Sequence, residues 1–198
     1  MKIRFIKVAK YGTKISVDQK YQYYCRSSTQ QADPDVELPI SYVSQYHLGQ
    51  YQSIYSSPLR RAISSAKYLS SDVVVKGELR EVRFDLAKLV TPGEYIKYGS
   101  SLVRDRFVQA FIQDKLMEPR KEIIDRVKIL MAYLRQSKSI DTICVSHSFL
   151  MKIIEAYIAR VDLLHDPTRL AEFITPMTKT YPYGGGFIIR VQSTRGVI

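Results

Sequence analysis

The residues best suited to chemistry are a few polar side chains that follow apolar, strand-like runs. Arg61 follows the run at 53–55, and His147 follows the run at 142–145. Each lies beside the expected start of a helix, where backbone N–H groups and the helix dipole favour an anion. The planar guanidinium of arginine adds a fork of donors that matches phosphate oxygens. These residues predict an oxyanion pocket between Arg61 and His147.

The elements that must position this pocket are short strands that alternate with helical patterns. The strand-like runs are Ile3–Val8, Ser53–Tyr55, Val73–Val75, Thr142–Val145 and Phe187–Val191. Such alternation is typical of a sheet covered by helices on both faces, and ligands collect at the carboxyl ends of its strands. We therefore predict one α/β domain over residues 1–198, with three layers and a mostly parallel central sheet.

Three helices are expected between these strands, each with apolar residues at helical spacing. In the first, Ser57 is suited to cap the helix and Pro58 to occupy its first position. The second spans about 119–135, and the third follows the run at 142–145. The apolar positions are Leu59, Ala62, Ile63, Ala66 and Leu69 in the first helix, Ile123, Val127, Leu130, Met131 and Leu134 in the second, and Leu150, Ile153, Ile154, Tyr157 and Ile158 in the third.

Two segments have weaker patterns. Residues 83–117 carry Pro92, Gly93 and Gly99, and the stretch at 11–39 is polar and irregular. We interpret 83–117 as an excursion from the sheet that caps a site. Both segments are equally consistent with surface loops.

The composition limits the possible settings and partners. The 198 residues include 30 Lys and Arg against 19 Asp and Glu, a net charge of +11 that favours anionic partners or simply maintains solubility. The cysteines, Cys25 and Cys144, are far apart without metal-ligand spacing, so we predict no zinc site, and Cys144 is expected in the core. Lys7 and Lys10 interrupt the N-terminal apolar run, and no stretch is long enough to span a bilayer. A reducing cytoplasm, with no membrane contact and no cofactor, is the expectation.

Four motifs, in order and spacing, resemble one known family. They are Ile54–Ala66 (IYSSPLRRAISSA), Leu79-Arg80-Glu81, Val145-Ser146-His147-Ser148 and Tyr183-Gly184-Gly185-Gly186-Phe187. The sequence is similar to the histidine phosphatase superfamily, also called phosphoglycerate mutase-like. The resemblance implies that Arg61 and His147 contact a phosphoryl group and that Glu81 supplies an acid. Glu81 is alternatively a partner for Lys10 or Arg61, and Ser57 either a helix cap or a phosphate ligand.

One departure from the family concerns its nucleophile. The resemblance implies an Arg-His-Gly triplet after the first strand, where this sequence has Lys10-Tyr11-Gly12. Lys10 keeps the positive charge for phosphate binding but lacks the bidentate fork. Tyr11 replaces the imidazole with a phenol, whose ordinary pKa of about 10 keeps it protonated near neutral pH. His47 and His165 do not follow a strand end and are interpreted as surface or structural residues.

Three hypotheses arise from this departure. The leading one is a phosphatase fold that binds a phosphate-bearing small molecule or phosphoprotein with impaired catalysis. The alternative is an active phosphomonoesterase or phosphoglycerate mutase-like enzyme that uses Tyr11 or a relay through His147. The third is a basic interaction module, for nucleic acid or an acidic protein. Basic residues are numerous at 76–88 and 104–128, but they form no stacking motif that would favour nucleic acid. The sequence does not predict the ligand or the oligomeric state.

Overall fold

The fold is described from a computed structural model, which places residues 1–7, 21–22, 25–26, 28, 51–137, 139–174, 181 and 185–190. These residues form a five-stranded sheet in the order β3-β2-β4-β1-β5. Its strands are β1 (Lys2–Lys7), β2 (Ser53–Ser56), β3 (Val74–Val75), β4 (Asp141–Ser146) and β5 (Gly186–Arg190). β1, β2, β3 and β4 run parallel, and β5 pairs antiparallel with β1. The predicted α/β class and mostly parallel sheet are confirmed.

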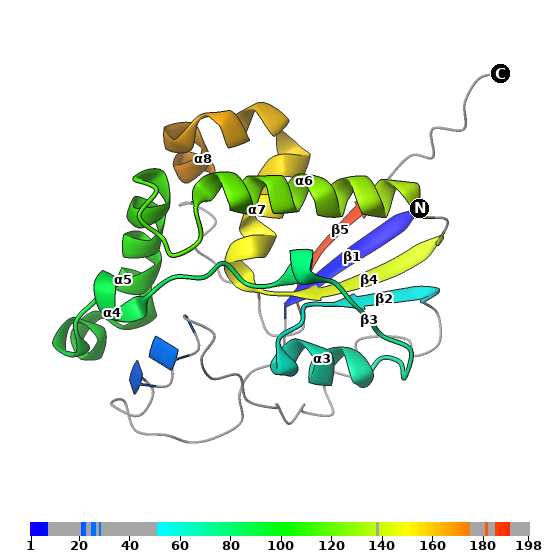
Figure 1. Ribbon diagram of the computed structural model, residues 1–198, viewed down its shortest axis with the longest axis horizontal. Coiled ribbons are helices and arrows are strands. Elements are labelled where there is room, and N and C mark those ends of the chain that lie inside the picture. Colours follow the sequence, from blue (N-terminus) through cyan, green and yellow to red (C-terminus); the bar gives the residue numbers. More distant parts are fainter. Residues whose placement is uncertain are drawn as a thin grey trace.

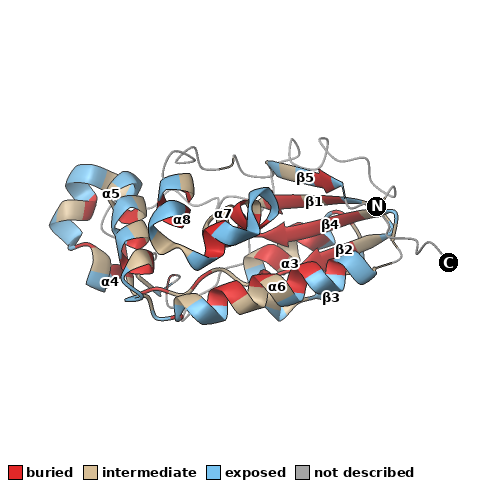
Figure 2. Cartoon of the chain, turned by 90° about the horizontal axis from the view of Figure 1, so that it is seen from above, coloured by how far each residue is buried: buried red, intermediate tan, exposed pale blue. Residues whose placement is uncertain are grey.

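The sheet has an apolar core on each face, because successive strand residues point to opposite sides. Cys144 packs in the larger core, whereas its neighbours Ile143 and Val145 pack in the smaller one. β1 alternates in the same way, with Phe5 in the larger core and Ile6 in the smaller. Figure 2 shows these central strands as buried. Cys144 is fully buried, as predicted.

Helices cover both faces of the sheet (Figure 1). The larger core receives apolar side chains from α6 (Arg120–Gln136) and α7 (Ser148–Ala159). The smaller core receives Ala62 and Ala66 from α3 (Arg60–Lys67). The three-layer prediction is therefore confirmed. One position on α7 was predicted wrongly: Ile158 is 39% exposed, because it lies at the edge of the helix's buried stripe.

α3 begins later than the sequence predicted. Its N-cap is Leu59, and no side chain caps it, so Ser57 is not the helix cap and Pro58 is not its first residue. The Ser57 hydroxyl instead accepts the Leu59 N–H at 3.3 Å within the turn that precedes the helix. Ser57 is fully buried in this position and is available to the site.

The segment at 83–117 is largely helical, with α4 (Leu86–Leu89) and α5 (Pro92–Ile112). Thr91 and Glu94 form a reciprocal capping box at the start of α5. Gly99 interrupts α5 with φ 63° and ψ −152°, a conformation that glycine adopts without steric cost. This break changes the direction of the buried face, which explains the weak periodicity of the sequence. Both helices lie beyond the end of the sheet opposite the N-terminus (Figure 1).

Two short 3₁₀ helices and one α-helix complete the described elements. η1 (Gly77–Leu79) follows β3, η2 (Val161–His165) follows α7, and α8 (Pro167–Ile174) packs against α5 and α7. Within the placed residues, no helix is long and apolar enough to cross a membrane.

Candidate functional site

His147 and Arg61 meet at the carboxyl end of the sheet, as the sequence predicted. His147 directly follows β4 and Arg61 lies in the first turn of α3, and Arg61 Nη2 is 3.5 Å from His147 Nδ1. On the other side of the imidazole, Nε2 lies 2.8 Å from the Ser57 hydroxyl oxygen. The loop before α3 and the end of β4 thus hold one buried imidazole between a guanidinium and a hydroxyl.

The surroundings of His147 keep its imidazole neutral. The side chain is only 2% exposed, and its burial lowers its pKa well below the ordinary value. The positive charges of Arg61, Arg126 and Lys7 lower this pKa further. Because a guanidinium can only donate, Nδ1 is the acceptor and Nε2 carries the proton toward Ser57. His147 therefore offers an N–H donor to its hydroxyl-bearing side.

Glu81 occupies the start of α7. Its carboxylate accepts the N–H groups of Leu150 at 3.0 Å and Phe149 at 3.3 Å, and also the N–H of Val82 at 3.0 Å. The prediction that these N–H groups bind an external anion is wrong, because a carboxylate of the chain already holds them. Burial raises the pKa of Glu81, while these hydrogen bonds and the Arg61 charge act in the opposite direction.

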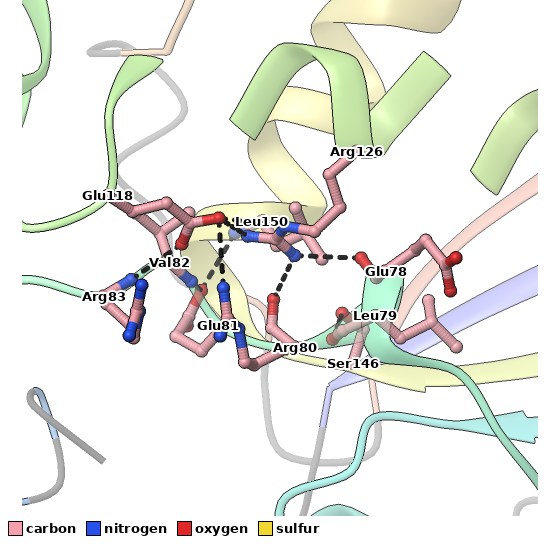
Figure 3. A network of polar contacts seen from close by, with 10 residues as sticks. All are labelled: Glu78, Leu79, Arg80, Glu81, Val82, Arg83, Glu118, Arg126, Ser146 and Leu150. Atoms are coloured by element: carbon pink, nitrogen blue, oxygen red, sulfur yellow. Dashed lines mark hydrogen bonds and ion pairs between the residues drawn. The ribbon is translucent and has the colours of Figure 1, made fainter. Parts of the chain in front are cut away.

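A buried ion-pair network braces the loop that carries Glu81 (Figure 3). Glu118, 1% exposed, pairs with Arg126 Nη2 at 2.8 Å and with Arg80 Nη2 at 3.3 Å. Its second carboxylate oxygen accepts the Arg83 N–H at 3.1 Å. One carboxylate therefore joins α6 to residues on both sides of Glu81.

The same loop is fixed from α6 and from β4 (Figure 3). Arg126 Nη1 donates to the carbonyls of Glu78 at 2.9 Å and Arg80 at 2.6 Å. The buried Ser146 hydroxyl donates to the Leu79 carbonyl at 2.9 Å. Glu81 is consequently held by a scaffold that sequence reasoning missed, since Glu118 and Arg126 are far from the motifs along the chain.

Lys7 is a further residue of the site that the sequence reasoning did not select. It is the last residue of β1 and pairs in register with Ser146, which directly precedes His147. Burial lowers the pKa of its ammonium group, the Glu81 charge raises it, and the Arg104 charge lowers it. Its Nζ donates to the Tyr181 carbonyl at 3.2 Å. The position at the end of a strand beside His147 was the available signal for this cation.

The other predicted residues divide into two groups. Lys10, Tyr11 and His47 lie outside the described residues. Arg60 is exposed beside the half-buried Arg61, and His165 is exposed in η2, as expected for residues outside the pocket. Among the residues that the structure places, no group of three His, Cys, Asp or Glu side chains is arranged to hold a metal ion.

The fold, with His147, Arg61 and Glu81 gathered at its carboxyl edge, is that of a phosphoglycerate mutase-like α/β protein. The chain belongs to the histidine phosphatase superfamily (branch 1), which it matches over residues 43–181. No curated protein matches it.

Several solved structures share this fold at low sequence identity. A phosphoserine phosphatase mutant (H9A) from Entamoeba histolytica, in complex with phosphoserine, has 16% identity and a TM-score of 0.54, over 100% of this chain and 99% of that one. A mycobacterial glucosyl-3-phosphoglycerate phosphatase has 20% identity and a TM-score of 0.55, over 92% and 88% of the two chains. The alpha-ribazole phosphatase from Shigella flexneri has 14% identity and a TM-score of 0.54, over 93% and 87%.

Proposed function

We propose that this protein binds a phosphate-bearing small molecule or phosphoprotein between Arg61 and His147, and that its catalysis is impaired. The observation that carries the proposal is the pairing of Arg61 with a buried, neutral His147 beside Lys7. Arg61 and Lys7 supply positive charge, and His147 supplies a directed donor. Charge-assisted hydrogen bonds of this kind are the strong ones in phosphate recognition.

Impaired catalysis is proposed from the sequence of the segment after β1. In the superfamily that the sequence resembles, the attacking histidine comes after the first strand, but residues 8–20 contain no histidine. Tyr11, the residue that corresponds to it in the motif, carries a phenol that is a poor nucleophile unless it is deprotonated. A different alignment of this segment would not restore an imidazole. Binding without efficient turnover is the function that these residues support.

An active phosphomonoesterase is the second candidate, and Glu81 is the observation that favours it. Burial raises the pKa of this carboxyl group, and a carboxyl that retains its proton nearer neutral pH is suited to protonate a leaving group. In that case Tyr11 would have to act as the nucleophile.

Phosphate binding is tested by thermal unfolding of the full chain in inorganic phosphate. Ligand binding to the folded state raises the melting temperature, and Arg61→Ala should abolish the increase. Arg60→Ala is the matched control, because Arg60 is the exposed neighbour on the same helical turn. Equal phosphate-induced shifts in wild type and Arg61→Ala would overturn the proposed site.

Catalysis is tested with p-nitrophenyl phosphate and a panel of phosphometabolites. We expect little turnover by the wild type and a gain in a variant that restores the family motif. Two such variants are needed: Lys10→Arg with Tyr11→His, and Lys7→Arg with Val8→His, since β1 ends at Lys7. Efficient wild-type turnover that disappears in Tyr11→Phe would refute impaired catalysis and establish the second candidate.

A further inference from the structure

Arg104 is a cation on α5 that the proposed phosphate site does not use. It lies three residues before Phe107 and seven before Phe111, so the three share one side of the helix. Phe107 and Phe111 are both buried, which turns this side of α5 toward the protein. Arg104 is half-buried at the edge of that face.

The face of α5 that carries Arg104 packs against the start of α7. The Phe107 ring stacks on the Phe149 ring with centroids 3.8 Å apart and planes 10° apart. The N–H of Phe149 is one of the groups that donate to Glu81. The Arg104 charge also lowers the pKa of Lys7, in addition to the larger effect of burial. Arg104 is thus directed toward the same site as Lys7 and Glu81, from the side of α5.

The guanidinium group of Arg104 lacks a partner of its own. Its Nε is shielded from solvent, and among the described residues Arg104 makes no hydrogen bond or ion pair. Arg126, by contrast, shares the buried carboxylate of Glu118. A shielded donor without an acceptor is costly, and a bound anion would satisfy it.

We propose that Arg104 receives a second anionic group of the ligand whose phosphate binds at Arg61 and His147. The ligand is then a phosphomonoester with a further acidic group, a carboxylate or a second phosphate. This inference rests on the proposed function and adds the class of ligand. Arg61 and Lys7 approach from the sheet and Arg104 from α5, so the two anionic groups are recognised by different elements.

The experiment compares ligands that differ in one acidic group, by titration calorimetry on the full chain. O-phosphoserine is paired with O-phosphoethanolamine, which lacks the carboxylate, and fructose 1,6-bisphosphate is paired with fructose 6-phosphate. A charge-assisted contact predicts about tenfold tighter binding of the diacidic member in at least one pair. The pair that shows the preference identifies the second group as carboxylate or phosphate.

Variants at Arg104 show whether this residue causes the preference. Arg104→Gln should remove it and leave the affinity for the monoacidic ligand unchanged, and Arg104→Lys should restore part of it. Arg106→Gln is the matched control, because Arg106 is an exposed arginine on the same helix that pairs with Glu94. The control should keep the full preference.

Two sets of results separate failure of this inference from failure of the proposed function. If monoacidic esters bind through Arg61 but no diacidic ligand is preferred, or if Arg104→Gln weakens both members of a pair equally, the inference is overturned and the phosphate site stands. If no phosphate ester binds, or if binding survives Arg61→Ala, the proposed site is overturned and the inference with it.

Discussion

Removal of the Glu118 carboxylate tests the scaffold that holds Glu81. Glu118→Ala deletes a side chain that pairs with Arg126 and Arg80 and accepts the Arg83 N–H. The Arg126 side chain is only 12% exposed, so the substitution leaves a largely buried guanidinium without its counter-charge. The expected result is a large loss of stability together with a loosened Glu81 loop.

The magnitude follows from the burial of the pair. Breaking a buried ion pair by removing one partner costs about 3–5 kcal/mol, since the remaining charge is uncompensated. With a urea m-value of about 2.5 kcal/mol/M, the unfolding midpoint should fall by about 1–2 M. Glu118→Gln retains an acceptor for the Arg83 N–H and should lose less than Glu118→Ala.

The assay is urea unfolding followed by circular dichroism, with Asp125→Ala as the control. Asp125 pairs with Lys121 on the exposed side of α6, and the side chains are 45% and 86% exposed. Solvent screens such pairs, so the control should unfold near the wild-type midpoint. A midpoint for Glu118→Ala no lower than that of Asp125→Ala would refute the argument that the buried network braces the loop.

Three further predictions concern the site and the sheet edge. Because the pKa of His147 is lowered by folding, its stability contribution is present above about pH 6.5 and is lost as the pH falls, by at most about 1.4 kcal/mol per pH unit; urea midpoints from pH 5 to 7.5 should show a smaller slope in His147→Gln, and an unchanged slope would contradict this. Ser57→Ala removes the partner of His147 Nε2 and should cost about 1–3 kcal/mol in urea unfolding, whereas a neutral effect would argue against that hydrogen bond. Gly186→Ala would bring a methyl group into the carbonyl of Phe5 on β1 and should lower the melting temperature, whereas Gly93→Ala, with nothing within 4 Å, should not; similar temperatures for the two variants would refute the close approach of β5.

The fold was predictable because its signals are local in the sequence. The apolar run of β4 lies between polar residues, and the apolar positions of α6 recur at helical spacing, so each element is marked by its own residues. The start of α3 was predicted too early. Ser57 and Pro58 have the composition of a helix start, but Ser57 is held in the preceding turn beside His147.

The surroundings of the site were not predictable for the opposite reason. The contact between Glu118 and the Arg83 N–H joins residues 35 apart, and the contacts of Arg126 with Glu78 and Arg80 join residues more than 40 apart. No local pattern distinguishes such residues from ordinary charges at the start of a helix. Arg61 and His147 were found because each lies in a motif at a strand end, where the sheet itself brings distant segments together.

The position of Glu81 changes how a phosphate would have to be held. A helix N-terminus that faces a pocket ordinarily supplies N–H donors and positive potential to an anion. Here Phe149 and Leu150 donate to Glu81, so the start of α7 is neutralised by the protein's own carboxylate. An incoming phosphate would therefore depend on side chains, chiefly Arg61 and Lys7. Binding that depends on two cations should be sensitive to each of them, whereas an anion held by backbone N–H groups would tolerate loss of either.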